Sequence, residues 1–210
     1  MSTPLWQPSQ QETEKTLLTH FSKKIQQKYK LPDIEYSTLH QWSIEFPELF
    51  WEEVWIDCEV RCSVPWTKVM SKTGFSEKIG TEPSGWFTGA RLNFAENLLA
   101  QGKAENEALC FIGEDASTRS LSYAELRKAV EQCASGMQAL GVTANDRVAA
   151  VLPNCPEAVI GMLAAASLGA IWSSCSPDFG INGIYDRLGQ ISPKILITVN
   201  AYNYNGKEHQ

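Results

Sequence analysis

The stretch Val148–Pro177, VAAVLPNCPEAVIGMLAAASLGAIWSSCSP, decides the fold class of this chain. It begins with the short apolar run Val148–Leu152 and continues with Pro156, a residue suited to the first position of a helix. Apolar residues then recur at helical spacing as far as Gly169, and a second strand-like run, Ala170–Ser174, follows. Apolar strand, helix and strand in this order are typical of a parallel sheet covered on both faces.

The same alternation continues on both sides of this stretch. Downstream, a helix around Leu188 ends at Pro193 and precedes a third apolar run, Ile195–Val199. Upstream, Ser122 and Glu125 have the spacing of a capping box at the start of another helix. We therefore assign the α/β class, with a parallel sheet and covering helices.

The first half of the chain has a different character, since six of the seven tryptophans precede Asn97. Ser9 and Glu12 form a capping box, and the apolar residues behind them recur every fourth position, which predicts one helix of about five turns. These apolar residues are Leu17, Phe21, Ile25 and Tyr29. A second helix is predicted from Pro47, whereas the turn-rich segment 61–89 shows no regular pattern. The part of the chain before Asn97 is therefore predicted to be a Trp-rich, mainly helical segment.

Composition narrows the class of function. With 210 residues, 43% of them hydrophobic, the chain has the size of one large domain or slightly more. Its net charge is −6 and both halves are acidic, which argues against nucleic acid as a partner. No apolar run approaches the roughly 18 residues that cross a bilayer, and the polar start predicts no signal peptide.

The six cysteines are dispersed, which favours reduced thiols and a cytoplasmic (cytosolic) location over a disulfide framework. Cys58 and Cys62 have the spacing of half a zinc site. No second Cys/His pair completes such a site, so we expect two structural thiols and no metal.

Sequence motifs alone name no reaction, since dinucleotide, phosphate-loop and nucleophile-elbow signatures are absent. Three segments remain as candidates. Segment 86–97 reads as a glycine turn and a capped helix. Segment 173–180 follows a parallel strand, and is either a ligand loop or a connection that caps the next helix. In segment 202–209, Asn205-Gly206 supplies a turn, and Lys207 either faces a phosphate or is simply solvated.

Longer strings carry a resemblance to a known family. WFTGARLNFAENLL (86–99) resembles the segment before the adenylation domain of acetyl- and acetoacetyl-CoA synthetases. LSYAEL (121–126), PNCPE (153–157) and AAASLGA (164–170) are similar to elements of acyl-adenylate-forming, or AMP-binding, enzymes in general. SSCSPDFGING (173–183) and YNGK (204–207) resemble the acetoacetyl-CoA synthetases more than their acetyl-specific relatives.

The resemblance implies an acid–thiol ligase that consumes ATP with Mg²⁺, forms an acyl-adenylate and pyrophosphate, and passes the acyl group to coenzyme A. It implies a domain division into residues 1–98, an acetyl-CoA-synthetase-like N-terminal extension, and 99–210, the first part of the AMP-binding domain. In the family, the ATP phosphate loop, the ribose-binding acid, much of the acyl pocket and the catalytic lysine lie further downstream. The resemblance therefore places no catalytic residue and no ATP or Mg²⁺ site in this chain, and we expect the chain to be inactive alone.

By position, the resemblance assigns Pro177 and Asp178 to the loop against the coenzyme A nucleotide, and Lys207 to the side of its 3′-phosphate. The acetyl-specific relatives carry glycines in the loop and arginine in place of the lysine, so backbone approach and bidentate contacts differ here. Three functions stay open: a ligase for acetoacetate, one for another short acid such as acetate or propionate, and a non-catalytic short form that binds a full-length subunit or a nucleotide.

Overall fold

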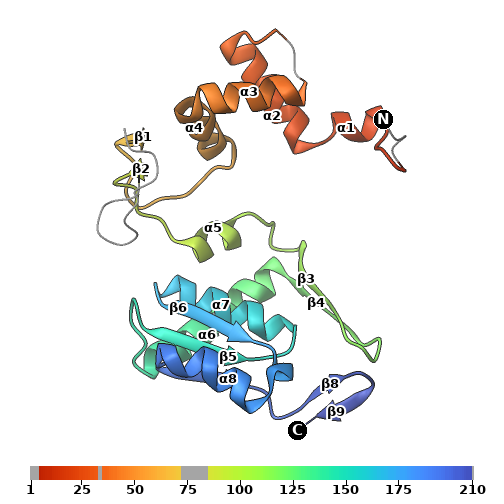
Figure 1. The fold of residues 1–210 in the computed structure, drawn as a ribbon, viewed down its shortest axis with the longest axis vertical. Coiled ribbons are helices and arrows are strands. Elements are labelled where there is room, and N and C mark those ends of the chain that lie inside the picture. The colour runs from red at the N-terminus through yellow and green to blue at the C-terminus, as the bar shows by residue number, and fades with distance from the viewer. Residues whose placement is uncertain (1–4, 33–34, 72–84, 210) are drawn as a thin grey trace. The chain divides into compact units, whose positions relative to one another are not determined.

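The computed structural model describes residues 5–32, 35–71 and 85–209, and the chain divides into two compact units between Arg91 and Leu92. Figure 1 colours the first unit red to yellow and the second green to blue. Within the described residues, no helix is long and apolar enough to cross a membrane.

The first unit begins with four helices. They are α1 (Gln10–Glu14), α2 (Leu17–Tyr29), α3 (Tyr36–Glu45) and α4 (Pro47–Asp57). The predicted capping box of Ser9 and Glu12 is present, and the predicted helix start at Pro47 is confirmed. The prediction of one long helix is wrong, because Thr16 has an extended backbone and accepts a hydrogen bond from the Thr19 amide at 3.2 Å. A threonine side chain that caps the chain in this way starts a new helix.

The core of the first unit is small and aromatic. Phe21, Ile25, Leu39 and Trp42 are buried at the contact of α2 and α3. The Trp42 ring packs against Tyr29, with ring centroids 4.8 Å apart. Offset or tilted aromatic pairs of this kind add to the free energy gained from burial.

A buried carboxylate joins α2 to α4. Glu53 is 1% exposed and accepts a 3.0 Å hydrogen bond from the Tyr29 hydroxyl while it pairs with Lys28. Lys24 Nζ lies 3.8 Å from its second oxygen. Burial alone would raise the pKa of Glu53, but the donors from Lys28 and Tyr29 outweigh it, so the pKa is lowered. The ionised pair thus links the two helices.

Two short strands complete the described part of the first unit. β1 (Lys68–Met70) pairs antiparallel with β2 (Trp86–Thr88). They lie in segment 61–89, for which the sequence predicted no regular element, and residues 72–84 of that segment are outside the described residues. Phe87 has a positive φ of 46° and its ring lies 4.5 Å from that of Trp55.

The second unit alternates strands and helices, as predicted. Its elements are α5 (Phe94–Ala100), β3 (Glu107–Ile112), β4 (Thr118–Ser122), α6 (Tyr123–Ala139), β5 (Arg147–Val151), α7 (Pro156–Ser167), β6 (Ile171–Cys175), η1 (Pro177–Phe179), α8 (Gly180–Leu188), η2 (Gly189–Ile191), β7 (Ile195–Thr198), β8 (Tyr202–Tyr204) and β9 (Lys207–His209). The parallel sheet has the order β6-β5-β7, and β3–β4 and β8–β9 are antiparallel pairs. The α/β class is confirmed.

Helices cover both faces of the central strand β5. Val148 belongs to the core that β5 shares with α6 and α7. Its neighbour Ala149 points to the opposite face, where it packs with Val151 and with Leu188 of α8. Because successive strand residues face opposite sides, a strand covered on both faces is apolar along its covered length, which in β5 is residues 148–151.

Glycines set how α7 sits on the sheet. A Cβ atom at Gly161 would lie 2.8 Å from the Trp172 ring of β6, so the absence of a side chain allows this close packing. Gly169, with a φ of +70°, follows the end of α7 in the left-handed conformation typical of helix ends. The predicted helix boundary at Gly169 is confirmed.

Candidate functional site

The carboxyl ends of the three parallel strands converge on one edge of the sheet. The chain leaves β5 through Pro153 and Asn154, β6 through the loop Ser176–Gly180, and β7 into the β8–β9 hairpin. Figure 1 shows this hairpin beside the tip of the β3–β4 ribbon. Ligands of open α/β sheets bind beyond this edge, so its loops form the candidate site.

The loop after β6 is held by its own side chains. Ser176 Oγ donates to Asp178 Oδ2 at 2.8 Å and accepts from the Asp178 amide at 3.3 Å, which caps η1. The first turn of α8 has no side-chain cap. The sequence left two interpretations of this segment, a ligand loop or a connection that caps the next helix. Ser176 does cap the short helix η1, but it does not cap α8. Pro177 is half-buried, and Asp178 is exposed at the surface.

A tyrosine connects this loop to the hairpin. The Tyr202 hydroxyl on β8 donates to Asp178 Oδ1 at 3.2 Å. Partial burial and this bond to an anion raise the pKa of Tyr202, so the phenol stays a neutral donor. The two predicted segments, 173–180 and 202–209, therefore meet through a direct contact.

Lys207 begins β9 and is exposed. It lies opposite Tyr204 across the two-residue turn Asn205-Gly206, and this turn was predicted from the sequence. The Gly206 amide donates to Glu114 Oε2 at 3.3 Å, which connects the turn to the β3–β4 ribbon. The structure thus places Lys207 on the hairpin that contacts Asp178, with its ammonium open to solvent.

A small cavity lies at this edge, with a volume of about 190 Å³. It is lined by the β3–β4 turn, the loop after β5 and the start of β8, with polar groups from Glu114, Asn154 and Tyr202. Tyr202 belongs to the predicted segment 202–209 and Asn154 to the family-like string 153–157, whereas the sequence analysis did not single out Glu114. Ligand pockets usually occupy about 300 Å³ or more. This cavity is smaller than such pockets.

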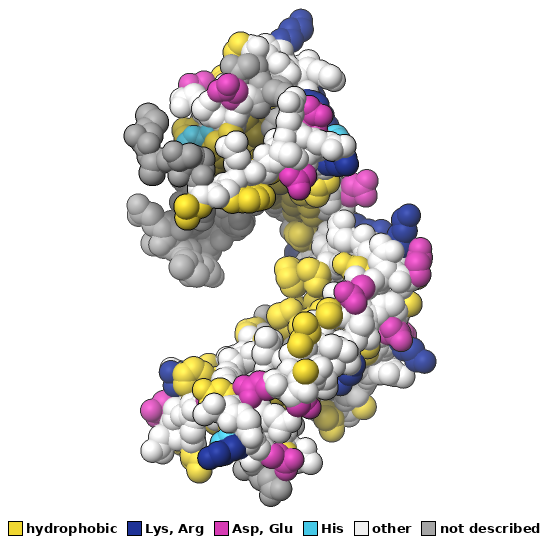
Figure 2. All heavy atoms as spheres, turned by 90° about the vertical axis from the view of Figure 1, so that its right-hand side faces the viewer, with side chains coloured by type: hydrophobic (Ala, Val, Ile, Leu, Met, Phe, Trp, Pro, Cys, Tyr) yellow, Lys and Arg dark blue, Asp and Glu magenta, His cyan; other side chains and the backbone are white. Residues whose placement is uncertain are grey.

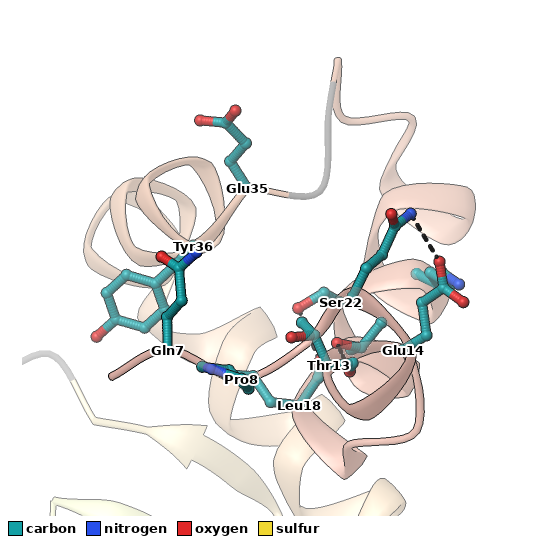
Figure 3. A pocket seen from close by; sticks show the side chains of 11 residues that line it. Gln7, Pro8, Thr13, Glu14, Leu18, Ser22, Glu35 and Tyr36 are labelled. Carbon is teal, nitrogen blue, oxygen red and sulfur yellow. Dashed lines mark hydrogen bonds between the residues drawn. The ribbon is translucent and has the colours of Figure 1, made fainter. Parts of the chain in front are cut away.

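A larger groove of about 720 Å³ lies in the first unit, among α1, α2 and the start of α3. Figure 3 shows Tyr36 and Glu14 on opposite sides of it and the Glu35 carboxylate turned away from the other side chains. Glu14 accepts from Gln10 at 3.1 Å. The groove contains no predicted site residue, and its titratable groups do not converge on one point.

The structure also locates the cysteines and the charges. All six cysteines are free thiols; Cys58 is exposed and Cys62 is half-buried. Among the described residues there is no group of three or more His, Cys, Asp or Glu side chains arranged to hold a metal ion. On the face shown in Figure 2, basic and acidic side chains are interspersed.

Comparison with known proteins assigns the chain to a family. The model of the AMP-binding enzymes matches residues 98–210, and the model of the acetyl-coenzyme A synthetase N-terminus matches residues 36–98. The chain belongs to the AMP-binding enzyme family. The resemblance stated from the motifs is confirmed.

Individual relatives and a solved structure show which members of the family this chain is similar to. Acetoacetyl-coenzyme A synthetase of Rhizobium meliloti is 40% identical over 207 residues, which cover 97% of this chain and 30% of the relative. Malonamoyl-CoA synthetase vrtB of Penicillium aethiopicum is 40% identical over 210 residues, which cover 98% of this chain and 28% of the relative. The solved acetoacetyl-CoA synthetase of Streptomyces lividans matches 100% of this chain and 32% of its own, with a TM-score of 0.88 and 37% identity. The chain thus spans about 30% of the length of these AMP-binding relatives.

Proposed function

We propose that this chain is the N-terminal part of an acetoacetate–CoA ligase, which converts ATP, acetoacetate and coenzyme A into acetoacetyl-CoA, AMP and diphosphate. The observation that carries the proposal is the match to the Streptomyces lividans acetoacetyl-CoA synthetase, which extends over both units. The similar Rhizobium meliloti enzyme supports the same substrate. The cytosolic location expected from the cysteines stays a prediction.

The described residues provide no geometry from which a site for ATP or Mg²⁺ can be assigned. They contain no group of three or more His, Cys, Asp or Glu side chains arranged to hold a metal ion. The family resemblance places both sites in the part of such ligases that lies outside this chain, and the proposal adopts that placement. The same holds for the catalytic residues, so the chain alone has no adenylation activity in this proposal.

The contribution of this chain to the reaction is to position coenzyme A. Lys207 offers an exposed ammonium to the 3′-phosphate, as a point charge without the fork of an arginine. Pro177 and Asp178 border the nucleotide, and the bond from Tyr202 keeps the Asp178 loop next to the hairpin. The close placement of these segments supports the assignment.

Substitution of Lys207 tests this assignment in a full-length ligase that carries the sequence. Lys207→Ala should raise the KM for coenzyme A about tenfold, because a hydrogen bond to a charged group contributes about 1.5 kcal/mol or more. Exchange of pyrophosphate into ATP, which needs no coenzyme A, should not change. Lys103→Ala is the matched control, since Lys103 is also exposed and belongs to the same unit. An unchanged KM for coenzyme A in Lys207→Ala would remove Lys207 from the site.

A ligase for another short acid is the second candidate, because the malonamoyl-CoA synthetase is as similar to this chain as the acetoacetyl-CoA synthetase. A panel of acetoacetate, malonamate, acetate and propionate, assayed with the full-length ligase, decides between them. The proposal predicts the highest kcat/KM for acetoacetate. A higher value for any other acid would replace it.

The third candidate is a non-catalytic short form that binds a full-length subunit. It is consistent with the partly uncovered face of β7, which another polypeptide segment could cover. Leu196 of β7 lies in register with Ala149 of β5 on the face of α8, yet Leu196 is 56% exposed and Ala149 is 0% exposed. Parallel sheets are normally covered on both faces. Co-purification of the tagged 210-residue chain with a full-length subunit would support the short form as a binding partner. Elution as a monomer without the subunit would count against it.

A further inference from the structure

The pair Asn-Gly occurs twice in the sequence, as Asn182-Gly183 and Asn205-Gly206. The first pair lies in α8, and the second forms the turn between β8 and β9. We propose that Asn205 is a site of spontaneous deamidation and that Asn182 is protected from the same reaction. Nothing in the proposed function requires either asparagine.

The reaction uses only groups of the chain and water. The Gly206 backbone nitrogen loses its proton and attacks Cγ of the Asn205 side chain. A new carbon–nitrogen bond closes a succinimide ring, the bond from Cγ to the side-chain nitrogen breaks, and ammonia leaves. Water then opens the ring to aspartate or isoaspartate. Glycine at the second position favours closure because it has no Cβ atom to obstruct the ring.

The turn at Asn205 is exposed and weakly held. Asn205 and Gly206 have positive φ angles of 52° and 69°, and both are exposed. The two strands have three residues each, and a two-stranded hairpin of this length is of marginal stability by itself. Two long hydrogen bonds, from Tyr202 to Asp178 at 3.2 Å and from Gly206 to Glu114 at 3.3 Å, connect it to the rest of the unit. Local opening, which lets the nitrogen reach Cγ, is therefore frequent at this turn.

The helix at Asn182 holds its Asn-Gly pair more firmly. α8 has nine residues and packs on the sheet through the buried Leu188 and the half-buried Ile184. Space around Gly183 is restricted, since a Cβ atom there would lie 3.2 Å from Phe179 Cβ. Asn182 is the third residue of α8, so cyclisation there requires the first helical turn to open, a step that the turn at Asn205 does not need. The same dipeptide is therefore an internal control.

The Glu114 carboxylate moderates the reaction at Asn205. It accepts a hydrogen bond from the Gly206 nitrogen, the atom that must lose its proton and turn toward Cγ. This bond holds the reacting nitrogen away from the ring-closing geometry. Loss of the Glu114 side chain should therefore speed deamidation at Asn205 and leave Asn182 unchanged.

Deamidation would change the surroundings of Lys207. It adds a negative charge two residues before the lysine, and isoaspartate also lengthens the backbone of a two-residue turn. A loss of coenzyme A affinity on ageing follows from this change, and this consequence rests on the proposed function of Lys207.

The experiment ages the purified 210-residue chain in mildly alkaline buffer and quantifies aspartate and isoaspartate by peptide mass spectrometry. We expect Asn205 to convert at least about tenfold faster than Asn182, because opening free energies differ widely between loop tips and packed helices. Equal rates, or faster conversion at Asn182, would overturn the proposal. So would a product that persists in the Asn205→Gln variant, since it would arise from Asn200 or Asn203.

Two further arms separate the modification from its consequence. Glu114→Ala should accelerate conversion at Asn205, and an unchanged or slower rate would contradict the role given to Glu114. Coenzyme A affinity is compared for fresh and aged full-length ligase. If Asn205 is converted and the affinity for coenzyme A does not change, the role proposed for Lys207 is contradicted. The proposal that Asn205 deamidates would still stand.

Discussion

The two units of the chain bury different kinds of side chain. The second unit has one aliphatic cluster on each face of β5, and the larger cluster contains the fully buried Val148, Leu163 and Ala164. The first unit buries four apolar residues in its core and relies in addition on aromatic contacts and on the ion pair of Glu53 with Lys28. A large aliphatic core stabilises its unit through the apolar surface area that it buries. A small core depends more on a few specific aromatic and ionic contacts.

The largest expected effect is the loss of an aliphatic side chain in the second unit. Leu163→Ala should lower the free energy of unfolding of this unit by about 4 kcal/mol, because it removes buried area and leaves a cavity. Urea unfolding followed by circular dichroism measures it. Leu140→Ala, at an exposed position, should change stability little. A loss below about 1 kcal/mol for Leu163→Ala would show that the core can collapse around the site.

The ion pair of the first unit should be next in size. Lys28→Ala leaves the buried Glu53 carboxylate with only Tyr29 and the more distant Lys24, so it should lower the free energy of unfolding of the first unit. The loss should be smaller than for Leu163→Ala, because Lys28 is half exposed and water already screens its charge. The same unfolding experiment measures it, with the exposed Lys23→Ala as control. If both lysine variants were equally stable, the first unit would not depend on this contact.

The two capping boxes give a smaller and more selective comparison. Ser122 caps α6, which carries buried residues, whereas Ser9 caps α1, which carries none. Ser122→Ala should cost about 1 kcal/mol and Ser9→Ala close to nothing, because the cap of a helix without core contacts adds little to global stability. Equal costs in thermal unfolding would contradict this difference.

The smallest expected effect is a dependence of the stability of the second unit on acidic pH. Hydrogen bonds from Lys194 and Thr143 lower the pKa of Asp146 to about 2. The folded-state pKa lies below the unfolded one, so the contribution of this carboxylate is present above the unfolded pKa and is lost as pH falls through about 4 to 2. Thermal unfolding across this range should show a shallower pH dependence for Asp146→Asn than for the exposed Asp186→Asn. Identical pH profiles would exclude Asp146 as the cause.

The α/β core was predictable because local pattern and tertiary environment agree there. The apolar runs near Val148 and Ile195 became parallel strands, and the helix between Pro156 and Gly169 formed as the spacing predicted. In the first unit, Thr16 overrides the apolar repeat by capping a new helix. A single polar side chain can break a helix that hydrophobic periodicity alone would continue.

The candidate site was predictable only in part. The position of Asp178 after a parallel strand and the turn at Asn205 could be derived from sequence. The bond from Tyr202 to Asp178 spans 24 positions and depends on how the hairpin folds back, which no local pattern encodes. β4 was missed because its sequence, Thr118–Ser122, is mostly polar and becomes a strand through pairing with β3.

The exchange of labelled pyrophosphate into ATP tests the central proposal most directly, because this exchange reports acyl-adenylate formation and nothing after it. The assay is run with acetoacetate on the 210-residue chain alone and on a full-length ligase that carries it. We predict exchange by the full-length ligase and none by the chain alone. Exchange by the chain alone, or its absence in the full-length ligase, would contradict the proposal.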